Sequence, residues 1–152
     1  MSDPPGESTE PTRASAQTVG RWLLAGFMAF AGVGHFAAPE AFLAQVPEWL
    51  PLRLPIVYAS GAVEIGFAVA LVALPRKRVA IGWALAAFFV VVFPGNVNQA
   101  LTGEPAFGLE TESGRWIRLL FQPVLVAWAL WSTGAWRAWR SRARAGRVTG
   151  RP

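Results

Sequence analysis

Four long apolar runs divide this chain, and they constrain its fold more than any other feature of the sequence. A helix of about 20 residues, rising about 1.5 Å per residue, crosses a hydrocarbon core of about 30 Å. Charged residues make up 15% of the chain, below the roughly 25% of soluble domains. We therefore predict an all-α polytopic membrane protein built as a four-transmembrane-helix bundle. Its spans are predicted at about residues 19–38, 56–74, 79–99 and 115–135.

The rest of the chain divides into tails and connections. Residues 1–18 are rich in Pro, Ser, Thr and Glu and have little to bury, which predicts a disordered tail. Residues 19–136 form the transmembrane domain, and residues 137–152 form a basic tail. Residues 38–55 combine four prolines with apolar side chains such as Trp49, which predicts a loop in the membrane interface. We interpret the first run as an uncleaved helix rather than a signal peptide, because three further spans follow it.

The basic residues predict the orientation. Eleven of the 14 Lys and Arg residues lie before residue 22, in the turn at 75–78 or after residue 136. The positive-inside rule then places both termini in the cytoplasm. The net charge of +5 has two explanations, nucleic acid or the cytoplasmic membrane surface. The second is favoured, because a basic juxtamembrane tail is attracted to anionic lipid. We expect membrane lipids as partners and no nucleic acid.

The residue inventory excludes several chemistries. The chain has no Cys, so it forms no disulfide, thiolate nucleophile or Cys-ligated metal site. It has one His and, apart from Met1, one Met, so one subunit cannot supply two axial haem ligands. We predict no catalytic residue, no metal site and no covalently bound cofactor.

Strongly polar residues inside the spans are energetically costly and mark structural or functional sites. With about 1.5 Å per residue, the predicted topology places them in the outer half of the bilayer. Pro94 and Pro123 lie near the same depth and free backbone carbonyls there. The predicted intramembrane polar cluster, a ligand or ion-pair site, comprises His35, Glu64, Asn96, Arg118 and Gln122. Its secondary members are Ser60, Asn98, Gln99 and Arg115.

Each member of this cluster also has a purely structural interpretation. Glu64 either forms a buried ion pair with Arg118 across the second and fourth spans, or contributes to a functional pocket. His35 either makes a hydrogen bond near a helix end, or relays protons. The amides at positions 96–99 either cap a helix end or line the pocket. The sequence leaves these alternatives open.

Five segments, in this order, resemble the DoxX-like family of small bacterial membrane proteins over about residues 32–131. They are GVGHFAAPEAF (32–42), VPEWLP (46–51), SGAVEIGFAVAL (60–71), FPGNVNQAL (93–101) and RLLFQP (118–123). The resemblance implies a four-helix bundle in the bacterial plasma membrane. It carries over His35, Glu64, Asn96, Arg118 and Gln122 as the polar positions of the family.

The resemblance also implies a link to quinone-linked redox systems, although the absence of Cys departs from relatives that work through thiols. One hypothesis is a non-enzymatic accessory or assembly subunit of a membrane redox complex. The alternative is a binding protein for a quinone or another lipid-soluble molecule, held by the polar cluster. A transporter is a third hypothesis that would require a homo-oligomer, because four helices leave little room for alternating access.

Overall fold

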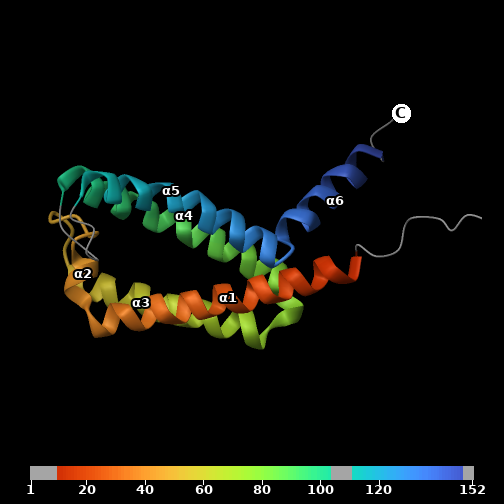
Figure 1. Cartoon of the computed structure of the whole chain (residues 1–152), viewed down its shortest axis with the longest axis horizontal. Helices are drawn as coiled ribbons and strands as arrows, with labels where there is room; N and C mark the ends of the chain where they lie inside the picture. Colours follow the sequence, from red (N-terminus) through yellow and green to blue (C-terminus); the bar gives the residue numbers. More distant parts are fainter. Residues whose placement is uncertain (1–9, 104–110, 149–152) are drawn as a thin grey trace, which may run out of the picture.

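The computed structural model describes residues 10–103 and 111–148, and the described chain is almost entirely helical (Figure 1). It contains no strand in these two ranges, so the all-α prediction is confirmed. The helices are α1 (Glu10–Ala37), α2 (Pro39–Leu43), α3 (Arg53–Ala73), η1 (Pro75–Lys77), α4 (Arg78–Thr102), α5 (Glu112–Ser132) and α6 (Ala135–Val148).

The four long helices are arranged as two pairs. α1 packs along α3, and α4 packs along α5. The pairs meet where α1 contacts α5, at the end of the molecule that carries α6, and they diverge toward the end that carries α2 (Figure 1). We call these the α6 end and the α2 end. α3 and α5 make no contact with each other in the described chain.

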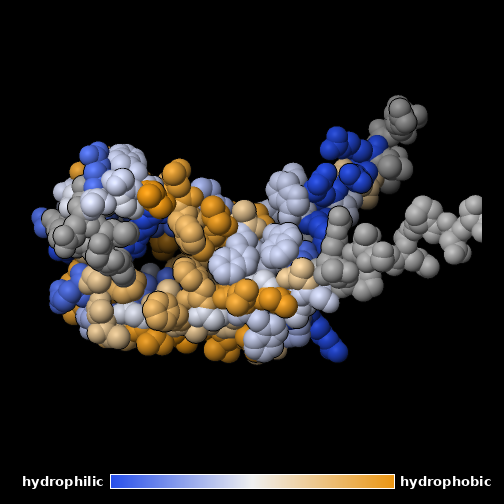
Figure 2. Space-filling model, in the orientation of Figure 1, coloured by the Kyte–Doolittle hydropathy of each residue, from blue (hydrophilic) through white to orange (hydrophobic). Residues whose placement is uncertain are grey.

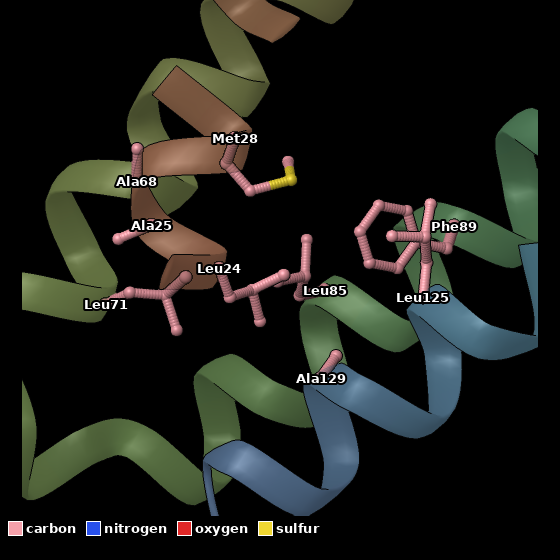
Figure 3. Packing of buried hydrophobic residues seen from close by; sticks show 9 residues of the cluster. All are labelled: Leu24, Ala25, Met28, Ala68, Leu71, Leu85, Phe89, Leu125 and Ala129. Carbon is pink, nitrogen blue, oxygen red and sulfur yellow. The ribbon is translucent and has the colours of Figure 1, made fainter. Parts of the chain in front are cut away.

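The hydrophobic core is shared by all four long helices (Figure 3). Leu24 and Met28 of α1 point toward Leu85 and Phe89 of α4 and are completely buried. Ala129 of α5 is also completely buried, and its small side chain fits this junction between the pairs. The other members of the core are Ala25, Ala68, Leu71 and Leu125.

The face of the molecule seen in Figure 2 is mostly apolar between two ends that carry hydrophilic side chains. Val69, Val91 and Leu120 are at least 60% exposed, as expected for side chains that face lipid. Two segments, α3 and the continuous η1–α4 segment Pro75–Thr102, are long and apolar enough to cross a membrane. α5 and α6 meet the same criterion together as a bent pair, which gives up to three spans in the described chain.

The structure is helical in two segments where the sequence predicts a tail and a loop. α1 begins at Glu10, so residues 10–18 are helical where the sequence predicts a disordered tail. Gln17 explains part of this difference, because its Nε2 atom donates a hydrogen bond of 2.8 Å to the Trp131 carbonyl. The predicted loop at 38–55 contains the short helix α2, with Pro39 in its first turn, where proline is favoured. Residues 1–9, 104–110 and 149–152, which include parts of both predicted tails, lie outside the described residues.

The predicted basic tail is also helical, and a glycine sets its direction. α5 ends at Ser132, and Gly134 has a φ of 74°, a left-handed conformation that glycine adopts at little cost. The amide of Gly134 donates to the Trp131 carbonyl at 3.1 Å, closing the last turn of α5. α6 then leaves at an angle of 69° to α5.

Candidate functional site

His35 of α1, which is buried, and Glu64 of α3, which is partly buried, form a polar pair. The Nδ1 atom of His35 lies 3.4 Å from Glu64 Oε2 and 2.9 Å from the Ala31 carbonyl. A carbonyl can only accept, so Nδ1 carries the proton and donates to Ala31. Glu64 Oε2 is therefore close to His35 but receives no hydrogen bond.

Two glycines bring this pair together. A Cβ atom on Gly61 would lie 2.6 Å from the His35 Cβ and 2.9 Å from the Gly32 carbonyl oxygen, so α1 and α3 cross in close contact here. His35 and Glu64 each follow one of these glycines by three residues. Side chains lean toward the N-terminus of their own helix, and in an antiparallel pair these directions converge. The spacing of glycine to polar residue thus produces the contact.

Helix α2 and its connection to α3 cover this pair at the α2 end. The Phe42 ring stacks on the His35 ring, with centroids 3.7 Å apart. Gln45 reaches the other helix pair, because its carbonyl oxygen would lie 2.8 Å from a Cβ atom on Gly95. Arg53 fixes the connection by donating to the carbonyls of Leu43 at 2.9 Å and Val46 at 3.1 Å.

A second buried polar group joins α4 to α5. Asn96 Nδ2 donates to Gln122 Oε1 at 3.1 Å, and Gln122 Nε2 donates to the Phe89 carbonyl at 2.5 Å. Phe89 lies close to Pro94, which cannot continue the backbone hydrogen bonds of α4. Pro94 leaves the Val90 carbonyl without its helical donor, so Gln122 donates to the carbonyl directly beside this interruption.

The polar residues predicted from the sequence thus form two groups, one in each helix pair. The predicted ion pair between Glu64 and Arg118 is not formed, because α3 packs against α1 and does not contact α5. Arg118 is partly buried and has interactions of its own. Among the secondary residues, Gln99 is buried and Ser60 and Asn98 are partly buried. The Arg115 side chain lies outside the described part of the structure.

Three buried polar atoms toward the α2 end have no hydrogen-bond partner among the residues that the structure describes: Glu64 Oε2, Asn96 Oδ1 and Gln45 Nε2. The first two are acceptors and the third is a donor. Buried polar groups without partners are rare in folded proteins, since each costs about 1–3 kcal/mol. Figure 2 shows the surface hollowed between the helix pairs at this end, with hydrophilic side chains visible. The arrangement can bind a group that donates hydrogen bonds.

The donor set does not favour a metal ion. No group of three His, Asp or Glu side chains converges within residues 10–103 and 111–148. His35 and Glu64 are two potential ligands, and the Nδ1 atom of His35 is already committed to the Ala31 carbonyl. The polar residues are better suited to hydrogen bonding than to coordination.

Sequence reasoning missed several polar contacts. Phe42 and Gln45 lie in the segment predicted to be an interfacial loop, and nothing in the sequence around them indicates a contact with the polar residues. At the α6 end, Gln17 contacts Arg137, and Thr133 is completely buried against Gly82. A glycine that faces a small polar residue of another helix allows close packing, and Gly82 could have predicted the contact with Thr133 in this way.

A further groove in the described structure borders the Asn96–Gln122 group and lies away from His35 and Glu64. It has a volume of about 1020 Å³ and lies between α4, α5, α6 and residues 16–17 of α1. Gln122 is the one member of the predicted cluster that lines it. Its position away from His35 and Glu64 indicates a separate site.

Comparison with known proteins gives a family but no activity. No curated protein matches the chain, and no solved structure matches it. A profile of the family described as "Domain of unknown function (DUF8561)" matches residues 24–133, which contain both polar groups and end one residue before Gly134. The matched region covers most of the chain, so this protein is a member of the DUF8561 family.

Proposed function

We propose that this protein binds a small lipid-soluble molecule carrying hydroxyl groups, such as a quinol, between its two helix pairs. The observation that carries the proposal is the set of buried polar atoms without partners at the α2 end, above all Glu64 Oε2 and Asn96 Oδ1. These two acceptors suit hydroxyl donors better than the carbonyl oxygens of an oxidised quinone. The protein is non-enzymatic in this proposal.

The proposed setting is the bacterial plasma membrane, with α1, α3, α4 and α5 as four spans and both termini in the cytoplasm. The length of each helix supports this, because 21 residues, as in α3 and α5, extend about 30 Å. The basic turn at Arg76–Arg78 and the arginines of α6 support the orientation, because basic residues favour the cytoplasmic side. The polar site then lies in the outer half of the bilayer.

Each polar group has a distinct role in this proposal. Glu64 accepts a hydrogen bond from one hydroxyl, and His35 beside it offers a proton relay. Asn96 accepts from a second hydroxyl and is held in place by Gln122. The resemblance to the DoxX-like family adds support for a quinone-type ligand.

The test is mass spectrometry of the organic extract of gently purified protein. We expect an amphipathic hydroxyl-bearing molecule in near-stoichiometric amount, and its loss from the double variant Glu64→Leu/Asn96→Leu. The matched control is Val63→Leu, at an exposed position next to Glu64, which should retain the molecule. An extract that holds only bulk phospholipid, equally in wild type and double variant, would contradict the proposal.

A second candidate function is an accessory subunit of a membrane complex. The observation that favours it is a row of small residues on the outer face of α3, at spacings of three, four and seven. Ala59, Ala62, Gly66 and Ala73 are all exposed, and a Cβ atom on Gly66 would meet nothing within 4 Å. Small residues at such spacings let transmembrane helices approach closely. The partner is a transmembrane helix of a redox complex or of a second copy.

Co-purification tests this second function. We expect a stoichiometric membrane partner, or a homo-oligomer, with wild type, and its loss with Gly66→Leu. Val72→Leu on the same helix is the control. A protein that purifies as a monomer without partner in both cases would exclude the subunit role and leave ligand binding unaffected.

A further inference from the structure

The groove at the α6 end is polar beside α6 and mostly apolar elsewhere, with Gln122 as the polar residue at its far end. Arg137 and Gln17 lie at the end beside α6, and Val90 and Phe93 of α4 lie at the other. Between them the wall follows α5 from Trp131 to Gln122, nine residues or about 14 Å of helix. That length is close to one leaflet of a hydrocarbon core of about 30 Å. The groove has the polarity and the length of a lipid.

α6 is amphipathic beside this groove. Arg137, Arg140, Arg144 and Arg147 follow at intervals of three and four residues, so they share one face of the helix. Trp136 and Trp139 pack on each other on a neighbouring face, with ring centroids 5.2 Å apart, and both are about half exposed. Basic residues beside exposed tryptophans are typical of helices that lie in a membrane interface.

The bend between α5 and α6 places α6 where it can lie in the membrane interface. A helix at 69° to a spanning helix lies close to the membrane plane. Gln17 holds the angle, because it contacts Arg137 of α6 and donates to the Trp131 carbonyl of α5. Arg has five N–H donors, so this contact leaves donors of Arg137 available.

We propose that the groove between α5 and α6 binds one anionic phospholipid of the leaflet at the α6 end. Its phosphate lies at Arg137, beside the arginine face of α6, and one acyl chain runs along Val126 and Pro123 toward Gln122. Charge complementarity selects an anionic headgroup, since Arg forms bidentate contacts with phosphate. The volume of about 1020 Å³ is at the upper limit of pockets for small ligands, which suits a chain with a headgroup.

This site goes beyond the proposed binding of a quinol-like molecule and does not depend on it. It requires only that α5 cross the membrane. The lipid would fill the angle between α5 and α6 and fix α6 on the membrane surface.

The test is native mass spectrometry of the purified full chain, titrated with phosphatidylglycerol or with phosphatidylcholine of the same chain length. We expect the first bound lipid to be phosphatidylglycerol, with a preference of about fivefold or more, since one basic residue near the surface contributes about that factor. Arg137→Gln should remove this preference. Arg142→Gln, which removes an equal charge from the opposite face of α6, should keep it.

A second pair of variants tests the apolar part of the groove. Ala127→Trp fills the groove from an exposed position of α5 and should abolish binding of the first lipid. Val124→Trp, at an exposed position outside the groove, should bind as wild type does. Equal binding of the two lipids, equal effects of the two arginine variants, or unchanged binding by Ala127→Trp would each overturn the proposal. Displacement of the lipid by millimolar glycerol phosphate would also overturn it, because the site would then recognise phosphate alone.

Discussion

Glu64 Oε2 lies 3.4 Å from Nδ1 of His35, on the neighbouring helix, and the two side chains are in direct contact. The single proton of Nδ1 is directed to the Ala31 carbonyl. Glu64 is thus adjacent to a titratable ring and still has an oxygen without a partner. This combination is suited to binding a hydroxyl group and to exchanging a proton with it.

The contact between His35 and Glu64 should appear as an energetic coupling. We expect a double-mutant cycle of His35→Gln and Glu64→Gln to give a coupling of about 0.5–1.5 kcal/mol, because residues in contact are not additive. The cycle of Glu64→Gln with Arg118→Gln should give a coupling near zero, because their helices do not touch. Unfolding in mixed detergent micelles measures both. A larger coupling for the second cycle would restore the ion pair expected from the sequence.

The crossing of α1 and α3 should be intolerant of any side chain at Gly61. We expect Gly61→Ala to destabilise by about 1–3 kcal/mol, because the added methyl would meet the backbone carbonyl of Gly32. Gly26→Ala and Gly66→Ala are matched controls in the same two helices, where a Cβ atom meets nothing within 4 Å. They should be neutral or stabilising by up to about 1 kcal/mol, since Ala favours helix. Equal losses at all three positions would contradict the close crossing.

Asn96 and Gln122 should be coupled through their amide hydrogen bond. We expect each single change to Leu to be destabilising, because it leaves the other amide without its partner. Their coupling should be about 0.6 kcal/mol and at most about 1.7 kcal/mol, as for other hydrogen bonds between transmembrane helices. The same unfolding assay measures it. A coupling of zero would show that the two amides do not meet in the membrane.

The orientation of the chain in the membrane can be determined by labelling single introduced Cys residues, because the chain contains no Cys of its own. We expect Thr111→Cys, before α5, to react with a membrane-impermeant maleimide in intact cells. Ser141→Cys, on α6, should react only after the cells are permeabilised. Both positions are exposed, so accessibility to the reagent depends on the side of the membrane. The reverse pattern would place the polar site on the cytoplasmic side.

Much of the helical architecture could be predicted from apolar run length alone. The predicted spans at 56–74 and 79–99 lie almost entirely within α3 and α4, because long runs leave few alternatives to helix. The ends were harder to predict. α1 starts earlier than its apolar run because Gln17 contacts α5 and α6, and such contacts have no local signature.

In the candidate site, too, the sequence predicts features within one helix but not the contacts between helices. Depth along each helix grouped His35, Glu64, Asn96, Arg118 and Gln122, and the structure has these residues buried or partly buried. Depth does not determine which helices are neighbours. The pairing of α1 with α3 depends on the crossing of Gly32 and Gly61, and it gives Glu64 a histidine partner instead of Arg118.

Photo-crosslinking most directly tests the central claim that a hydroxyl-bearing lipophile binds between the helix pairs. A photoreactive quinol analogue is added to the membrane-embedded protein, and the labelled peptides are mapped by mass spectrometry. The expected result is saturable labelling near Gln45, Glu64 and Asn96 that free quinol competes away and that Glu64→Leu/Asn96→Leu abolishes. Labelling confined to the lipid-facing surface or to the α5–α6 groove, unchanged in the double variant, would contradict the claim.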